Sequence, residues 1–272
     1  MNRYTSAMPH DLRAILDGWE YEPGKISVRK IIGRDGHEKI QTRVDLGLLQ
    51  LEPDGRPDGR RPYGCESMLS FIETRLQEYT RKNGSDEGFL LLAEDCRDLR
   101  HEAHLYYQRY LSFFVLEEYS GVERDTARNL RLIDLCHQYA ETEYDRKALE
   151  SQRSYVLMMN TRAKAYRAMN AEDFETALEL VEQGLVELHR QEAEPDPPED
   201  EVTPAEIEVL EALRQEVLEQ MPENAIPRLK WELNVALECE DYEHAAELRD
   251  KLAASRRAGR GGRSAAPPHA HL

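Results

Sequence analysis

Histidine and acidic side chains recur at helical spacing at two places in the chain and could together hold a metal ion. Asp98 precedes His101 by three residues, with His104 one turn further along, and Asp241 precedes His244 by the same three residues. A carboxylate-bridged metal site in a helical bundle uses Glu-x-x-His on two helices and two further Glu side chains, whereas both pairs here begin with Asp. The pattern therefore favours structural histidines, and we expect neither a metal ion nor a cofactor.

The cysteines are the next candidates, for redox chemistry or zinc binding. Cys65, Cys96, Cys136 and Cys239 are spread over the chain without a CxxC pair, so neither zinc-ligand spacing nor a disulfide framework is met. A free cysteine beside apolar residues behaves as a small hydrophobic side chain. We expect buried, structural thiols.

Basic side chains are concentrated in the first 62 residues, which carry eleven Lys and Arg against ten Asp and Glu, in a chain whose net charge is −17. Arginine forks suit phosphate or carboxylate, so this segment is the place where an anion or nucleic acid could bind. The alternative is a solvated sheet face balanced by acids, with Arg–Asp clasps in the turns. The residues concerned are Arg29, Lys39, Arg43, Arg56, Arg60 and Arg61.

Several function classes lack their sequence signatures. No GxGxxG, phosphate-binding GK[ST], HExxH or GxSxG motif occurs, which removes the usual starting points for nucleotide-dependent enzymes and hydrolases. No apolar run approaches the roughly 18 residues of a membrane-spanning helix. We expect a non-enzymatic, soluble, cytoplasmic protein.

The N-terminal 62 residues are predicted to form a small β-hairpin module. A β-branched run at 26–32 leads into Gly33-Arg34-Asp35-Gly36, and residues 38–46 then alternate apolar and polar side chains. Strict alternation indicates a half-buried strand, and Asp-Gly between two such runs favours a hairpin. The run 46–51 could extend the sheet, and Pro-Asp-Gly-Arg, twice in tandem at 53–60, predicts successive turns.

From residue 63 onward the apolar period is helical, and we expect a mainly α fold of antiparallel helices. One long helix is predicted from near Ser85 to near Gly121, followed by helices at about 123–143, 145–169 and 173–190. The proline-rich acidic stretch 191–203 is predicted to be a linker, 204–255 a helix followed by a helical hairpin, and 256–272 a disordered basic tail. The linker would let 204–255 swing away unless the helix at 204–221 docks back.

An internal repeat marks two helix corners. Residues 172–180, EDFETALEL, align with residues 240–248, EDYEHAAEL. Asp173 and Asp241 can each cap a new helix. The aromatic residue that follows covers the joint, and small Ala177, or Ala245 with Ala246, permits close approach of the new helix to its predecessor. Each segment is therefore predicted to be the corner of a helical hairpin.

Both corners resemble known motifs. The segment 146–190 resembles a tetratricopeptide-like helical hairpin, although the full repeat pattern is not met. The run from Tyr242 to Asp250, YEHAAELRD, within 229–252, is similar to the UVR motif, a helical hairpin shared by the excision-repair proteins UvrB and UvrC, some Clp ATPases and activators of protein arginine kinase. The rest of the chain is similar to bacterial UVR-containing proteins without an assigned activity.

The resemblance to the UVR motif implies association, because such a hairpin pairs with another UVR hairpin in the same protein or in a partner. A pair of about 30 residues is too small to bury a sufficient core alone. We expect docking to another protein or self-association, with an intrachain cap of the helical stack and a repair-linked DNA-binding accessory factor as alternatives. The docking residues are predicted to be Leu229, Leu233, Ala236, Leu237, Tyr242, Ala245, Ala246, Arg249, Asp250 and Leu252.

Overall fold

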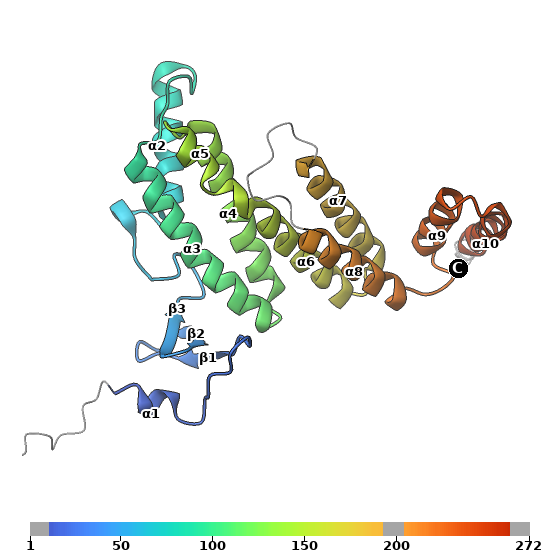
Figure 1. Cartoon of the computed structure of the whole chain (residues 1–272), viewed down its shortest axis with the longest axis horizontal. Coiled ribbons are helices and arrows are strands. Elements are labelled where there is room, and N and C mark those ends of the chain that lie inside the picture. Colours follow the sequence, from blue (N-terminus) through green and yellow to red (C-terminus); the bar gives the residue numbers. More distant parts are fainter. Residues whose placement is uncertain (1–10, 193–203, 262–272) are drawn as a thin grey trace, which may run out of the picture.

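The computed structural model describes residues 11–192 and 204–261, so the predicted linker core and most of the predicted tail lie outside the described residues. The fold is mainly helical, as predicted (Figure 1). In chain order the elements are α1 (Arg13–Leu16), β1 (Val28–Ile32), β2 (Glu38–Val44), β3 (Gly47–Leu51), η1 (Pro62–Gly64), α2 (Met68–Asn83), α3 (Ala93–Val115), α4 (Tyr119–Tyr139), α5 (Glu143–Lys147), η2 (Glu150–Gln152), α6 (Arg153–Asn170), α7 (Phe174–Glu192), α8 (Pro204–Gln220), α9 (Ile226–Glu238) and α10 (Tyr242–Gly261). No helix in the described part of the chain is long and apolar enough to cross a membrane.

The N-terminal sheet is antiparallel and has three strands in the order β1-β2-β3. The predicted hairpin is confirmed: β1 pairs with β2 across a turn in which Gly36 has a positive φ. The run 46–51 does extend the sheet, because β3 returns along β2 directly after Asp45 and Leu46. Gly55 and Gly59 in the two Pro-Asp-Gly-Arg turns also have positive φ, which glycine adopts without steric cost.

The sheet is attached to the helical part through α3. Ile40 and Leu51 share one buried cluster with Tyr110 and other residues of α3. Thr42 on the same face of β2 is within hydrogen-bond distance of the Ser112 hydroxyl, at 2.7 Å. The sheet therefore lies against one end of the helical stack and shares its core.

The predicted start of the long helix near Ser85 is wrong, because α3 begins at Ala93. Phe89 and Leu91 are buried while Leu90 and Leu92 are exposed, which is the period of an extended chain. The Leu91 amide donates to the Tyr139 carbonyl, and the Leu91 carbonyl accepts from Glu141. Four apolar residues in a row fit a strand or a helix equally well, and the contact with the end of α4 decides between them.

The predicted helix end near Gly121 is also wrong, because a corner at Glu117 separates α3 from α4. Glu117 is left-handed, as are Glu172 and Glu240 at the two predicted corners. At all three the next amide donates to the carbonyl five residues back, the hydrogen bond of a Schellman helix end. Asp173 and Asp241 accept the amides of Thr176 and His244, as predicted for N-caps.

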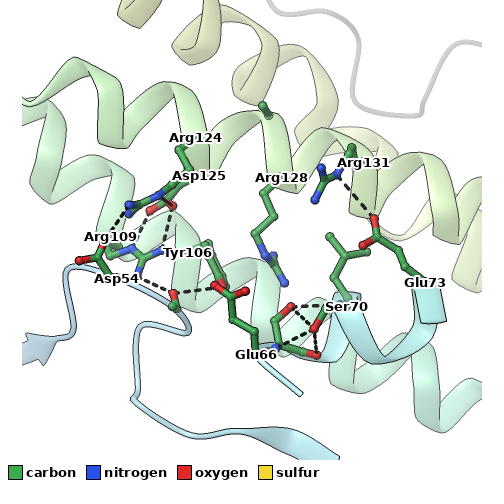
Figure 2. Close-up of a pocket in the computed structure, with 14 residues that line it drawn as sticks. Asp54, Glu66, Ser70, Glu73, Tyr106, Arg109, Arg124, Asp125, Arg128 and Arg131 are labelled. Carbon is green, nitrogen blue, oxygen red and sulfur yellow. Dashed lines mark hydrogen bonds and ion pairs between the residues drawn. The ribbon is translucent and has the colours of Figure 1, made fainter. Parts of the chain in front are cut away.

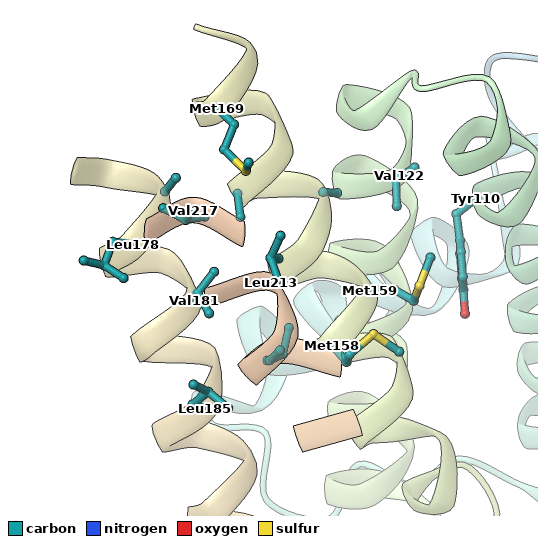
Figure 3. Close-up of a cluster of buried hydrophobic side chains, with 14 of the residues drawn as sticks. Tyr110, Val122, Met158, Met159, Met169, Leu178, Val181, Leu185, Leu213 and Val217 are labelled. Atoms are coloured by element: carbon teal, nitrogen blue, oxygen red, sulfur yellow. The ribbon is translucent and has the colours of Figure 1, made fainter. Parts of the chain in front are cut away.

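The helices stack in sequence, with α3 against α4, α4 against α6, α6 against α7, and α8 against both α6 and α7. Their main core contains Met158, Met159, Val181, Leu185 and other apolar residues of α6 and α7 (Figure 3). Leu210, Leu213 and Val217 of α8 are buried in the same core. The helix at 204–221 thus docks back onto the stack, and only α9 and α10 extend beyond it, at the end opposite the sheet (Figure 1).

Candidate functional site

The C-terminal hairpin has a small core of its own. Five residues are buried between α9 and α10, namely Leu229, Ala236, Ala245, Leu248 and Leu252, with Leu233 packed against them. Five of these six were among the predicted docking residues. They hold the two helices together and are not available to a partner. Leu248, which the prediction omitted, is fully buried, and its spacing of three from Ala245 and four from Leu252 is the signal that could have found it.

The other five predicted docking residues, Leu237, Tyr242, Ala246, Arg249 and Asp250, are exposed. Leu237 and Tyr242 are 48% and 67% exposed and lie on either side of the Glu240 corner. Rotation by 100° per residue places Tyr242, Ala246 and Arg249 on one flank of α10, and antiparallel packing brings Leu237 of α9 to the same flank. We call these four residues the outer flank.

The opposite side of the hairpin meets α8. Arg228 donates to the Leu218 and Met221 carbonyls at the end of α8, and the Arg214 guanidinium lies 5.7 Å from the centre of the Trp231 ring. Trp231 also packs against the main core. The hairpin is therefore attached to the stack through one side of α9, which leaves the outer flank uncovered within the described chain.

Three of the six predicted anion-contact residues are engaged in holding the N-terminal sheet together. Arg29 donates to the Gln41 side chain and lies 4.0 Å from the centre of the Trp19 ring. Arg43 donates to the carbonyls of Trp19 and Gly47. The segment 11–27 covers the face of the sheet that carries Arg29 and Arg43, through contacts with Ile15 and Trp19. The polar side chains of this face are therefore not fully solvated, although the alternating sequence pattern predicted a solvated face.

The third of these residues, Lys39, is buried, and its Nζ contacts Asp35 and Glu52 at 2.7 Å. Hydrogen bonds to Asp35 and Glu52 raise the pKa of Lys39, and the same contact lowers the pKa of Asp35. Lys39 is therefore charged and fully paired. It closes the sheet against the loop that follows β3.

Arg56, Arg60 and Arg61 lie together in the loop after β3, and of the other three only Lys39 lines a cavity with them. Arg56 contacts Asp58 at 3.1 Å and Glu102 at 2.9 Å, so one of the predicted Arg–Asp clasps is present. Arg60 is solvated, with Asp58 3.9 Å away. The Arg61 side chain is exposed and has no ion pair or hydrogen bond with the residues that the structure describes.

A cavity of about 510 Å³ between the loop, α2, α3 and α4 is lined by four arginines that the sequence analysis did not single out (Figure 2). Arg109 of α3 and Asp125 of α4 form a bidentate pair at 2.7 and 2.8 Å, and both side chains are buried. Arg109 also donates to the Glu52 and Gly55 carbonyls. One guanidinium thus joins α3, α4 and the loop after the sheet.

Glu102 is the acidic centre of the same network and is fully buried. Its carboxylate accepts the amides of Met68 and Leu69, the first two residues of α2, at 2.7 and 3.0 Å. Arg56 and Arg128 supply the opposite charge. A negative charge at a helix N-terminus is favourable, so Glu102 fixes where α2 begins.

Tyr106 completes the network between the two buried pairs. The Arg128 and Arg109 guanidinium carbons lie 3.6 and 4.7 Å from its ring centre, and its hydroxyl donates to the Gly55 carbonyl. Burial raises the pKa of Tyr106, so the hydroxyl remains a donor. At the mouth of the cavity Arg124 contacts Asp54, and Arg131 lies 3.6 Å from Glu73. All four arginines are therefore ion-paired, which indicates a structural clamp.

A sequence signal for this clamp exists. Glu102, Tyr106 and Arg109 follow one another at steps of four and three, which places them on one side of α3 beside the apolar stripe. Arg124, Arg128 and Arg131 have the same spacing on α4. From the sequence alone, charged residues at the edge of an apolar stripe are expected to be solvent-exposed. Only the packing of α3 on α4 brings the polar row of each helix into contact.

The structure also shows the surroundings of the histidines and cysteines that were considered as metal ligands or reactive thiols. Within residues 11–192 and 204–261 no three His, Cys, Asp or Glu side chains are arranged to hold a metal ion. Cys96 and Cys136 are buried as predicted, whereas Cys65 is half-buried and Cys239, at the corner after α9, is exposed. A hydrogen bond with Cys96, together with burial, raises the pKa of Cys136, which keeps that thiol protonated.

Comparison of the chain with models of protein families, with curated proteins and with solved structures finds no match. The similarity to the UVR motif therefore rests on the residues quoted above, and the function must be argued from the geometry.

Proposed function

We propose that this protein is a non-enzymatic interaction protein whose C-terminal hairpin docks onto another protein or onto a second copy of itself through the outer flank. The observation that carries the proposal is the division of the hairpin residues into two sets. One set closes the hairpin, and the other leaves Leu237 and Tyr242 exposed on a flank that α8 does not cover.

The composition of the outer flank supports the proposal. A small residue at Ala246 lets another helix approach closely, and Leu237 and Tyr242 supply apolar area on either side of the corner. Tyrosine is enriched at protein interfaces because it combines a large apolar ring with a polar tip. Arg249 and Asp250 follow at the border, where charges set orientation more than affinity.

The test uses two neighbouring alanines that point about 100° apart around α10, Ala245 into the hairpin core and Ala246 onto the outer flank. Ala246→Glu places a charge on the outer flank without touching the hairpin core, because Ala246 is exposed. We expect loss of self-association in light scattering, or loss of partners in affinity purification from the native host. Helix content by circular dichroism should be unchanged. Ala245→Glu, at a buried position, should instead unfold the hairpin.

The matched control is His244→Glu, which adds the same charge about 200° around α10 from Ala246, at an exposed position. Association should survive this change. If Ala246→Glu and His244→Glu leave association equally intact, the outer flank is not the docking surface.

The alternative of a repair-linked DNA-binding factor rests on the six N-terminal basic residues. Three of them are engaged within the sheet and its covering segment, and Arg56 is paired with Asp58 and Glu102. Two exposed arginines remain. Affinity for duplex DNA comes largely from many phosphate contacts, so this geometry favours the protein-interaction function.

A further inference from the structure

A second cavity, of about 440 Å³, adjoins the same loop after β3. Its walls come from the loop, η1, the start of α2 and α3, and they include Arg56, Arg60, Arg61, Tyr63, Asp98 and His101. The volume falls within the range of pockets that bind small molecules, roughly 300–1,000 Å³.

The arginines of this cavity differ in how they are held. Arg56 is only 11% exposed and is anchored by Glu102 and Asp58. Arg60 is 83% exposed, and the Arg61 side chain forms no interaction with the described part of the chain. Arg60 therefore keeps only the long 3.9 Å contact with Asp58, and Arg61 has no ion pair with the described residues, although the chain has a large acidic excess. Such groups bind phosphate oxygens through paired N–H donors.

Tyr63 supplies a different kind of surface at the same cavity. Its ring stacks on Phe71 with the centres 4.3 Å apart and an interplanar angle of 21°, yet 71% of the residue is exposed. One face of the ring is therefore covered and the other is open. The backbone of Tyr63 is left-handed, with φ of 50°, a conformation that non-glycine residues seldom adopt and that is associated with functional sites.

We propose that this cavity binds a free nucleoside monophosphate, whose base stacks on the open face of Tyr63 and whose phosphate is held by Arg60 and Arg61. Aromatic side chains bind bases by stacking with little dependence on which base is present. Neither the two arginines nor the tyrosine ring alone would specify this ligand. Because both line one cavity, the ligand that fits them carries a phosphate and a flat ring in one molecule.

A free nucleotide fits the surroundings better than a nucleic-acid strand does. Asp58, Asp98 and Glu66 lie around the loop, and a strand would have to run its further phosphates past these carboxylates. Binding of single strands also requires a basic groove with several stacking rings, whereas Tyr63 is the single Phe, Tyr or Trp among the described residues that line this cavity, beside the imidazole of His101. One base and one phosphate match the one open tyrosine ring and the two neighbouring guanidinium groups of the cavity.

The experiment is calorimetric titration of the full chain with AMP and with UMP, with adenosine and ribose 5-phosphate as probes that each lack one half of the ligand. We expect both nucleotides to bind, and each half-ligand to bind at least about tenfold more weakly. Ribose 5-phosphate binding as tightly as AMP would overturn the proposal, because the base would then contribute nothing. Absence of AMP binding at millimolar concentration would overturn it as well.

Two variants assign the binding to the cavity. Arg61→Gln removes the unpaired charge, and Tyr63→Asn removes the ring while keeping a residue that tolerates the left-handed backbone. Each should weaken AMP binding by at least about fivefold. The control Arg81→Gln, at an exposed position on α2, should not change it. Unchanged affinity in both cavity variants would place the nucleotide elsewhere and overturn the proposal.

One further probe separates the free nucleotide from a strand. Single-stranded pentaadenylate, titrated in the same way, should bind no more tightly than AMP. Tighter binding of the pentamer, with a steep dependence on salt concentration, would show that the cavity receives one residue of a longer strand, and the proposal of a free nucleotide would be overturned. Because α2 and α3, which line the cavity, lie far from α9 and α10 (Figure 1), Ala246→Glu should leave AMP binding unchanged.

Discussion

The arginine clamp and the C-terminal hairpin are held together by different forces. In the clamp, Arg109, Asp125, Glu102 and Arg128 are buried and join α2, α3, α4 and the loop after the sheet. In the hairpin, apolar side chains of two helices meet, and the connection to the stack comes from Arg228 and Trp231. The clamp joins distant segments in one geometry, whereas the hairpin is a local unit.

This difference bears on where binding surfaces can form. A buried ion pair is orientation-dependent, so the clamp fixes the position of the loop that carries Arg60 and Arg61. A hairpin with a five-residue core closes by local contacts and retains exposed apolar residues on one flank.

The largest effect is expected from Arg109→Met, which removes the bidentate partner of the buried Asp125 carboxylate and leaves it only the 3.0 Å contact with the partly exposed Arg124. Breaking a buried pair on one side costs about 3–5 kcal/mol. Urea denaturation of the full chain should show a loss of that size. The double variant with Asp125→Leu should recover most of the loss, because a buried charge no longer remains. A single variant as stable as the unmodified protein would show that the pair is not desolvated.

A somewhat smaller and local effect is expected from Leu248→Ala in the hairpin core. Removing a buried leucine side chain costs about 2–4 kcal/mol. Because the hairpin shares few contacts with the stack, hydrogen exchange should accelerate in α9 and α10 only. The comparison is Leu132→Ala in α4, a fully buried residue of the cluster between α2, α3 and α4. That change should accelerate exchange across α2–α4. Uniform acceleration in the Leu248 variant would contradict the independence of the hairpin.

Three helix corners contain a glutamate with a left-handed backbone, and substitution there measures the cost of that conformation. Glycine adopts this backbone without the steric cost that a Cβ atom imposes, but it also loses more entropy on folding. We expect Glu172→Gly and Glu240→Gly each to raise the free energy of unfolding by about 0.5 kcal/mol. Glu172→Ala keeps the Cβ atom and should give no gain. A loss of stability in the glycine variants would mean that the glutamate side chains themselves stabilise the corners.

The smallest effect is a pH dependence at the contact between α3 and α5. The hydrogen bond from Arg100 lowers the pKa of Asp145. A lowered folded-state pKa means that the carboxylate stabilises the fold above its ordinary pKa, and this contribution is lost as the pH falls through the folded-state value. Below about pH 4 the melting temperature of the unmodified protein should therefore fall more steeply than that of Asp145→Asn. Parallel curves for the two proteins would remove Asp145 from the acid response.

The sequence by itself determined the class of fold, the hairpin strands, the caps at Asp173 and Asp241, and the existence of a C-terminal helical pair. These features depend on neighbours within a few residues: alternation over β2, a turn glycine, an acid before a helix. Because these interactions involve residues that are close together in the sequence, the sequence alone is enough to predict them. The same reasoning named ten hairpin residues but could not tell the five that close the hairpin from the five that are exposed.

Only the tertiary structure decided the features that depend on distant segments. Leu91 became extended because the end of α4 offered its backbone a partner, and Lys39 became buried because the loop after β3 brought Glu52 to it. Glu102, Arg109 and Arg128 look like solvated charges until α3 and α4 meet. The physical reason is common to all of them: a polar group is buried only where its partner is present, and the partner is supplied by chain that is far away in sequence.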